Sequence, residues 1–346
     1  MVARKLALGL ALVATALAPV AVVTAAPPPR RDSLPLSLLA DLRLPGGATR
    51  FDYQSVDADQ RRLYIAHLGD HSLIAFDLDA QQVLGEVTGL PSVHGVVAAP
   101  AQHLVFATAT AQKALAIIDD RTLQVKSRVP AGAYPNGLAF DPASGRVFVS
   151  NNTGRGIAVV DVSNSRPLPS IDIGGGAGNT QYDAESGHVL AAVHGSPVLV
   201  EIDPAASRIV QRIALRKVST CHGLFVASRL RLAFAACRGA APLLVVVDLV
   251  TRQQTLSLPL PNEIDVLAFD PSLRRLYAAS ETGNVAVFAV ALDHAVSELG
   301  RGFIGPNAHT VAVDPATHRV YFPLENVAGR PVLRVMIPRA EPSPTE

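Results

Sequence analysis

The sequence predicts an all-β fold, a seven-bladed β-propeller whose blades are four-stranded antiparallel sheets. Three observations support this prediction: two phrases recur about every 42 residues, each copy contains four short apolar runs, and no segment shows a sustained helical period. Internal repeats of this length are typical of propellers and related repeat architectures. The number of copies and the length of the runs then favour a propeller.

The first recurring phrase ends an apolar run with aspartate, as in SLIAFDLDAQQVLGEV and ALAIIDDRTLQVKSRV. The shared aspartates follow one another in steps of 42, 42, 42 and 45 residues: Asp77, Asp119, Asp161, Asp203 and Asp248. Two further copies, NVAVFAVALDHAVSEL and PVLRVMIPR, lack this aspartate. A second phrase precedes each copy, as in NGLAFDPASGRVFVS and HTVAVDPATHRVYFP, so the repeat occurs seven times.

The apolar runs are about 4–7 residues long and rich in Val, Ile, Leu and Ala, which is typical of strands. Runs such as IAVV and LVVV are apolar at consecutive positions, so both faces of their sheets must be covered. Radial stacking of four-stranded blades achieves this, because each blade packs on its two neighbours.

The last copy supplies only three strands, within HTVAV, RVYFP and PVLRVMI. The segment LLADLRLPGGATRFD near the N-terminus resembles VLGEVTGLPSVHGV, the fourth strand of the first repeat and its link to the next. We therefore expect residues 37–44 to complete the last blade. Closing the ring in this way removes the sheet edges that an open stack would expose.

The third repeat carries the clearest family resemblance, in the segment GAYPNGLAFDPASGRVFVSNNTGRGIAVVDV. This segment resembles the YVTN-type, or YncE-like, repeat family, which belongs with the WD40/YVTN and quinoprotein-amine-dehydrogenase-like propellers. The resemblance spans roughly residues 35 to 337 and weakens in the fourth and fifth repeats. It implies the fold strongly and an activity weakly, because such scaffolds carry many functions.

The N-terminus has the pattern of a secretory signal peptide. Arg4 and Lys5 precede an apolar run from Leu6 to Val23, and small residues follow it. An uncleaved membrane anchor is the alternative, which Pro19 and the Ala-rich end disfavour. We therefore expect a signal peptide over 1–25, a flexible linker over 26–34, the propeller over 35–339 and a disordered tail over 340–346. The predicted location is the periplasm or the exterior, with no membrane span after cleavage.

The charge gives little support to a nucleic-acid partner. The formal net charge of the full chain is +1, and loss of Arg4 and Lys5 with the signal peptide changes it to −1. Nucleic-acid binders usually carry strong, clustered positive charge. A DNA-binding propeller, which the family resemblance allows, is therefore disfavoured. We expect a monomer whose partner is an unidentified small molecule, peptide or protein.

Polar residues recur where each innermost strand begins, on the face of a propeller that usually binds ligands. They are Asp52, His94, Asn136, Asn179 beside Gly178, His222, Asp265 and His309. Loops between second and third strands add His67 and His194 to the same face. These residues predict a ligand-binding channel mouth. The alternative is that they serve the fold alone, by hydrogen bonding to the channel backbone and ordered water.

Imidazole and carboxylate groups around one concavity also suit a divalent metal ion. The sequence offers His94, His222 and His309 as candidate ligands. They come from blades 2, 5 and 7, so the alternative is that they are too far apart to share one ion. No other cofactor is indicated.

Charged residues on the opposite face have a structural explanation. In five repeats an aspartate precedes a basic residue or histidine by five positions, which predicts ion pairs within the hairpins: Asp57, Asp141, Asp183, Asp270 and Asp314. The aspartates of the first phrase, Asp77 and its equivalents, fit turns in which the carboxylate accepts backbone N–H bonds.

The chain has two cysteines, Cys221 and Cys237, at the two ends of one predicted hairpin. The midpoint of that hairpin falls at its turn, near residues 228–230, so the cysteines should face each other. Cross-strand neighbours are close enough for a disulfide, which an oxidising compartment would preserve. A copper site built from both thiolates and His222 is the alternative.

Motifs for a specific reaction are missing: the sequence has no G-x-S-x-G, no H-E-x-x-H and no P-loop. The first functional hypothesis is therefore an exported binding or scaffold protein that uses the channel mouth. The alternative is a metal-dependent hydrolase or lyase, similar to propeller lactonases, with its site at the same mouth. A stoichiometric metal would favour the enzyme.

Overall fold

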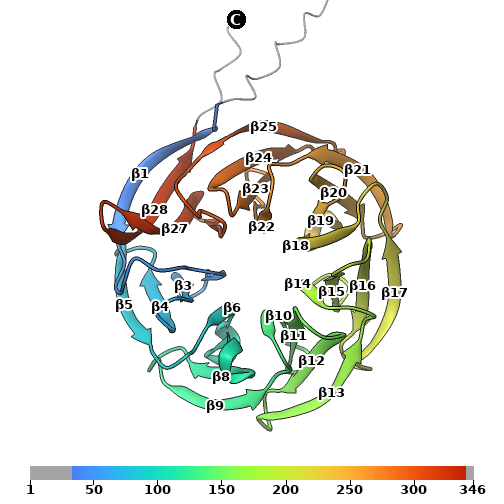
Figure 1. Cartoon of the computed structure of the whole chain (residues 1–346), viewed down its shortest axis with the longest axis horizontal. Coiled ribbons are helices and arrows are strands. Elements are labelled where there is room, and N and C mark those ends of the chain that lie inside the picture. The colour runs from blue at the N-terminus through green and yellow to red at the C-terminus, as the bar shows by residue number, and fades with distance from the viewer. Residues whose placement is uncertain (1–32, 340–346) are drawn as a thin grey trace, which may run out of the picture.

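The computed structural model describes residues 33–339 and confirms the seven-bladed propeller. Within these residues, seven antiparallel sheets of four strands surround one axis (Figure 1). The predicted signal peptide, most of the predicted linker and the predicted tail lie outside the described residues. In residues 33–339, helical structure is limited to 3-10 turns, and none could cross a membrane.

Each blade has an innermost, a second, a third and an outer strand. The innermost strands are β2 (Gln54–Asp57), β6 (Val93–Ala99), β10 (Pro135–Asp141), β14 (Ala177–Asp183), β18 (Thr220–Ala227), β22 (Ile264–Asp270) and β26 (Ala312–Asp314). The second strands are β3 (Arg62–His67), β7 (Leu104–Ala109), β11 (Arg146–Asn151), β15 (His188–Val193), β19 (Leu232–Arg238), β23 (Arg275–Ser280) and β27 (Arg319–Val327). The third strands are β4 (Ser72–Asp77), β8 (Ala114–Asp119), β12 (Gly156–Asp161), β16 (Val198–Asp203), β20 (Leu243–Asp248), β24 (Asn284–Val290) and β28 (Arg330–Pro338). The outer strands are β5 (Gln82–Val87), β9 (Val125–Pro130), β13 (Arg166–Asp172), β17 (Arg208–Ala214), β21 (Gln253–Pro259), β25 (Val296–Phe303) and β1 (Leu36–Arg43).

Burial follows the position of a strand in its blade. The middle strands are buried on both faces, as in β20, because a neighbouring blade covers each side. The outer strand β5 instead alternates exposed and partly buried residues. The core consists of layers between adjacent blades; in one of them Phe106 and Phe140 lie with ring centroids 5.0 Å apart. This packing is why the middle runs of the sequence are continuously apolar.

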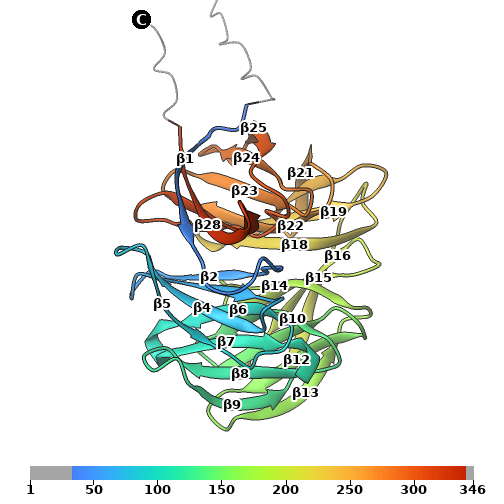
Figure 2. The ribbon, with the colours of Figure 1, turned by 60° about the vertical axis from the view of Figure 1, so that its left-hand side comes forward.

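The N-terminal strand closes the ring as predicted, beginning one residue earlier than expected. β1 pairs antiparallel with β28, from Leu36 opposite Pro338 to Arg43 opposite Val332. The guanidinium group of Arg334 donates two hydrogen bonds, of 2.8 and 2.6 Å, to the carboxylate of Asp41 across this pair. Figures 1 and 2 show β1 on the outside of the ring beside β28, where both ends of the described chain leave together.

The ion pairs of the opposite face join neighbouring blades. Arg61 of blade 1 donates two bonds of 2.7 Å to Asp314 of blade 7, and Arg231 of blade 5 bonds Asp183 of blade 4 at 2.6 Å. The predicted partner of Asp183 within its own hairpin, His188, instead contacts Glu201 at 2.6 Å. The prediction of pairing inside the hairpin is therefore wrong for Asp183 and Asp314. It is also wrong for Asp57 and Asp141, because Arg62 donates to the carbonyl oxygen of Asp120 and Arg146 to those of Pro204 and Ala205.

The geometry of the turns explains this difference. One carboxylate oxygen of Asp314 accepts the backbone N–H of Ala316, which fixes the side chain on its own turn. The carboxylate then meets the guanidinium group of Arg61, which the ring closure brings from blade 1. The turn role predicted for Asp77 and its equivalents is confirmed, since Asp77 accepts the backbone N–H groups of Asp79 and Ala80 at 2.8 and 2.7 Å.

The two cysteines form the predicted disulfide. Cys221 and Cys237 are direct partners in the ladder between β18 and β19, and a 3-10 turn over Ser228–Leu230 closes this hairpin. Both residues are buried, so the bond lies inside the fifth blade. The disulfide leaves no thiolate for the alternative copper site.

Replacing both cysteines by serine is expected to lower the free energy of unfolding by about 3 kcal/mol, because the disulfide closes a loop of 16 residues. Urea denaturation of the oxidised wild type and of Cys221→Ser/Cys237→Ser measures the difference. Reduced wild-type protein is the control and should resemble the variant. Equal midpoints for oxidised and reduced protein would contradict this role.

Candidate functional site

Irregular pairing at the start of the innermost strands directs polar side chains toward the channel. The ladder register shifts between Val93 and Val96 in the second blade, and at the equivalent place in blades 3 to 6. The polar residues predicted for the mouth lie within these interruptions: His94, Asn136, Asn179, His222 and Asp265. Bulges of this kind turn a side chain away from the regular alternation of a strand.

Glycines beside these residues let the innermost strands approach one another. A Cβ atom on Gly95 would lie 2.2 Å from the carbonyl oxygen of Asn136, and one on Gly223 would lie 2.7 Å from that of Asp265. A larger residue at either position would push adjacent blades apart. The sequence pattern of a polar residue followed by glycine, as in His94-Gly95, thus has a geometric cause.

A cavity of about 970 Å³ opens at this end of the channel. Six of the nine residues predicted for the mouth line it: Asp52, His94, Asn136, His194, His222 and Asp265. Few of its other lining residues are apolar. The structure therefore places most of the predicted residues, which are distant in the sequence, around one space.

The other three predicted residues lie elsewhere. Asn179 lines a second cavity of about 310 Å³ along the channel, and His309 is fully buried beside Asp52 and Asp265. His67 does not line either of these cavities; its ring stacks on Phe51 with centroids 4.1 Å apart. Burial lowers the pKa of His67, which favours the neutral ring in this packed position.

One hydrogen-bonded chain joins blades 4, 5 and 6. Nε2 of His222 lies 3.0 Å from Oδ1 of Asp265, and Nδ1 of His222 lies 2.8 Å from Nε2 of His194. Burial raises the pKa of Asp265, but the hydrogen bond and charge of His222, with the charges of His309 and Arg50, outweigh it and lower this pKa to about 2. An ionised carboxylate requires a donor, so the Nε2 proton of His222 is directed to Asp265.

His194 ends this chain in its neutral form. Burial, followed by the charge of the neighbouring His222, lowers the pKa of His194 to about 4. The two rings stack with centroids 5.0 Å apart. The arrangement can hold one proton between two imidazoles next to a carboxylate, which is a geometry suited to proton transfer or to orienting the carboxylate.

Asp52 and His94 form a second contact, between blades 1 and 2. Nδ1–H of His94 donates a hydrogen bond of 2.8 Å to the backbone carbonyl oxygen of Ser92, so Nε2 of the neutral ring carries a lone pair. That Nε2 lies 3.9 Å from Oδ2 of Asp52. Burial, followed by the charge of Asp265, raises the pKa of Asp52 well above its usual value.

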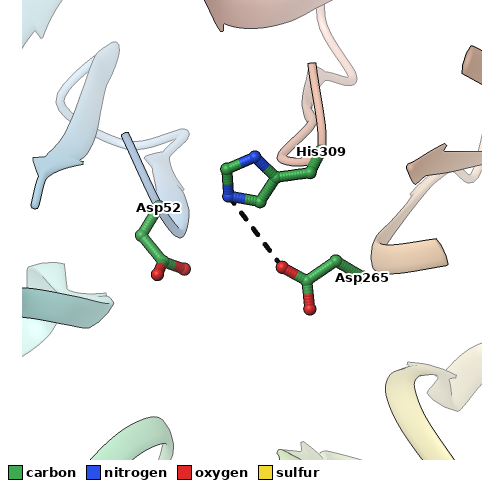
Figure 3. A group of neighbouring side chains, drawn as sticks. All are labelled: Asp52, Asp265 and His309. Carbon is green, nitrogen blue, oxygen red and sulfur yellow. Dashed lines mark ion pairs between the residues drawn. The ribbon is translucent and has the colours of Figure 1, made fainter. Parts of the chain in front are cut away.

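Three groups from adjacent blades converge at the cavity, where Asp52 and Asp265 line it and His309 lies behind them. Figure 3 shows His309 from blade 7 directed between Asp52 from blade 1 and Asp265 from blade 6. One ligand atom from each lies within 4.8 Å of the other two, a spacing that could hold a metal ion. Of the three histidines predicted as metal ligands, only His309 belongs to this group; His94 and His222 contact its carboxylates from either side.

Two residues at the site, Tyr53 and Arg50, were not predicted from the sequence. The hydroxyl group of Tyr53 donates to Asn179 and lies 3.4 Å from Nε2 of His222, so this side chain spans the channel. Tyr53 lines both cavities. Arg50 donates two bonds, of 2.9 and 2.7 Å, to Glu281 across the rim. Both residues flank Asp52 within RFDY, a stretch that could have signalled them.

Comparisons with known proteins support the fold. No family model matches the chain, and no curated protein matches its sequence. Among solved structures, a chain of hydrazine synthase from Kuenenia stuttgartiensis is similar, with a TM-score of 0.70 and 15% sequence identity. The similarity covers 82% of this chain and 94% of that chain. At this level of identity, the likeness concerns the propeller fold alone.

Proposed function

We propose that this chain is an exported β-propeller of the YVTN type that binds a small polar molecule in its central cavity. The observation that carries the proposal is the cavity of about 970 Å³ lined by polar groups from several blades. Volumes of this size are typical of small-molecule sites. Imidazole, carboxylate, amide and guanidinium groups line it together, so the ligand is expected to carry both hydrogen-bond donors and acceptors.

Export is supported by the sequence of residues 1–25 and by the disulfide. A positive segment, an apolar run and small residues form the pattern of a signal peptide. A buried disulfide is the bond expected of a protein that folds in an oxidising compartment. The mass of the protein recovered from a periplasmic fraction should correspond to a chain that starts near residue 26.

A small ligand fits this site better than a macromolecule does. The groups predicted to recognise it lie inside the cavity, and His309 beneath it is fully buried. A net charge of −1 after signal cleavage gives no attraction for DNA.

A metal-dependent hydrolase or lyase is the second candidate. The group formed by Asp52, Asp265 and His309 favours it, because two carboxylates and an imidazole can hold a divalent ion beside an open cavity. The chain from Asp265 through His222 to His194 would supply a proton acceptor near that ion. Binding remains the first candidate because it requires only the cavity and its polar lining.

Mass spectrometry of the molecules released on denaturation tests the binding function. Protein isolated from the periplasm without dialysis is expected to release one small polar compound in near-stoichiometric amount. Asn136→Trp, which fills the cavity, should reduce that amount about 10-fold or more, as expected when a buried site is blocked.

The matched control is Ala143→Trp, which adds the same ring at an exposed turn outside both cavities. This variant should release the same compound in the same amount as the wild type. Release of no compound from the wild type, or of equal amounts from Asn136→Trp and the wild type, would contradict the proposed function.

A further inference from the structure

Acceptor atoms of Asp52, Asp265 and His309 converge at the central cavity, and two of these atoms have no hydrogen-bond partner among the described residues. Oδ1 of Asp52 and Nε2 of His309 are buried and have no partner among the described residues. Asp52 is 3% exposed and His309 is 0% exposed, so water does not cover these atoms freely. Leaving buried polar atoms unpaired is costly, which indicates that another group satisfies them.

The tautomer of His309 is fixed by the backbone. Its Nδ1–H donates a hydrogen bond of 2.9 Å to the carbonyl oxygen of Asn307. Nε2 of the neutral ring therefore carries a lone pair, and it faces Oδ2 of Asp265 at 3.9 Å. Histidines that bind metals are commonly oriented by such a bond on the opposite nitrogen.

The carboxylate of Asp265 is oriented in the same way. Nε2 of His222 bonds Oδ1 at 3.0 Å, and this leaves Oδ2 to face His309. On the other side of the cluster, Nε2 of His94 lies 3.9 Å from Oδ2 of Asp52, while Oδ1 of Asp52 is the unpartnered atom. Asp265 thus has one oxygen bonded to His222 and one that faces His309, while Oδ1 of Asp52 is free for a ligand.

A cation explains this arrangement better than a proton does. The 3.9 Å between Nε2 of His309 and Oδ2 of Asp265 is too long for a hydrogen bond. Two donors with bonds of about 2.1 Å to the same ion can lie up to about 4 Å apart. A single proton joins only two atoms, whereas one ion can join all three and also offset the repulsion between two carboxylates.

We propose that Asp52, Asp265 and His309 bind one divalent transition-metal ion, zinc or manganese, at the base of the central cavity. A mixed set of imidazole and carboxylate ligands suits these ions, whereas calcium and magnesium prefer oxygen ligands alone. Three protein ligands leave coordination positions open, as in zinc sites that bind water or substrate.

The open coordination positions of the metal ion indicate which class of molecule the cavity would bind. A hydroxy acid or another compound with carboxylate or hydroxyl oxygens would complete the coordination of the ion. This assignment of the organic ligand rests on the proposed function, because it requires the cavity to bind a small molecule. The metal site itself requires only the three side chains and His222, which orients Asp265.

Isothermal titration of the metal-free, untagged mature protein with Zn²⁺ and with Mn²⁺ tests the site. One equivalent of at least one of these ions should bind, and Co²⁺ as a spectroscopic probe should show ligand-field absorption. Asp52→Asn keeps the shape of the side chain and should weaken binding by more than about 100-fold. His222→Gln, which alters a supporting group only, should weaken it by about 10–100-fold.

Glu263→Gln is the matched control, since it removes one carboxylate from the cavity lining without touching the cluster. Its affinity for the ion should equal that of the wild type. Absence of saturable binding by folded wild-type protein, or equal loss in Asp52→Asn and Glu263→Gln, would overturn the metal site. A released organic compound in a protein that binds no metal would overturn this inference and leave the proposed function intact.

Discussion

Deletion of residues 33–43 is expected to lower the free energy of unfolding by more than about 5 kcal/mol, a large share of the stability of a typical domain. This segment contains β1, whose loss exposes the edge of β28 from Val332 to Pro338. It also removes the buried side chain of Leu36 and the ion pair between Asp41 and Arg334. Urea denaturation followed by circular dichroism measures the change.

The control for this deletion is removal of residues 340–346, which leaves the pairing of β1 with β28 unchanged. That truncation should unfold at the wild-type midpoint. A synthetic peptide of residues 33–44, added to the protein that lacks 33–43, should restore part of the lost stability by strand addition. A wild-type midpoint for the shortened protein alone would contradict closure of the ring by β1.

Asp52→Asn is expected to stabilise the metal-free protein by about 2 kcal/mol, because a buried charge beside a second carboxylate is costly. Burial and the charge of Asp265 raise the pKa of Asp52 in the folded state. The penalty is therefore fully present above that pKa and disappears as the carboxyl group is protonated at lower pH. The advantage of asparagine should be largest in alkaline buffer and should shrink as the pH falls.

Urea denaturation with EDTA at several pH values measures this effect. Asp265→Asn is the comparison, and it should destabilise the protein because it replaces the charged acceptor of the bond from His222 by a neutral amide. A destabilised Asp52→Asn variant at alkaline pH would show that the carboxylate serves the fold. Stabilisation together with loss of metal binding is the combination expected of a functional residue.

The architecture could be predicted from the sequence because its signals are periodic. Seven copies of one repeat determine the number of blades, and the missing fourth strand of the last copy indicated that the N-terminal segment closes the ring. The disulfide was predictable for a related reason, since Cys221 and Cys237 lie at equal distances from the turn of one hairpin. Local patterns of this kind depend little on distant contacts.

Contacts between blades were harder to predict. The sequence placed the partner of Asp314 within its own hairpin, whereas Arg61 reaches it from the first blade because the ring closes there. His67 was expected in a loop, whereas it ends β3 and its ring turns into the core against Phe51. Repeat position alone does not determine the direction of a side chain.

The candidate metal ligands show the same limit. The repeat aligned His94, His222 and His309 at one rim, and their places in blades 2, 5 and 7 left open that they are too far apart to share one ion. Asp52, Asp265 and His309 come from blades 1, 6 and 7, which are consecutive in the closed ring, so their side chains meet. His94 and His222 come from the blades on either side of these three and contact their carboxylates.

Anomalous diffraction from crystals grown with Zn²⁺ tests the central claim most directly, namely that the cavity is built around an ion. Data collected on both sides of the zinc absorption edge should show one strong difference peak bonded to Asp52, Asp265 and His309. Crystals of Asp52→Asn grown in the same way should lose that peak. Density without an anomalous signal at this position in the wild type, with zinc bound only elsewhere on the protein, would contradict the claim.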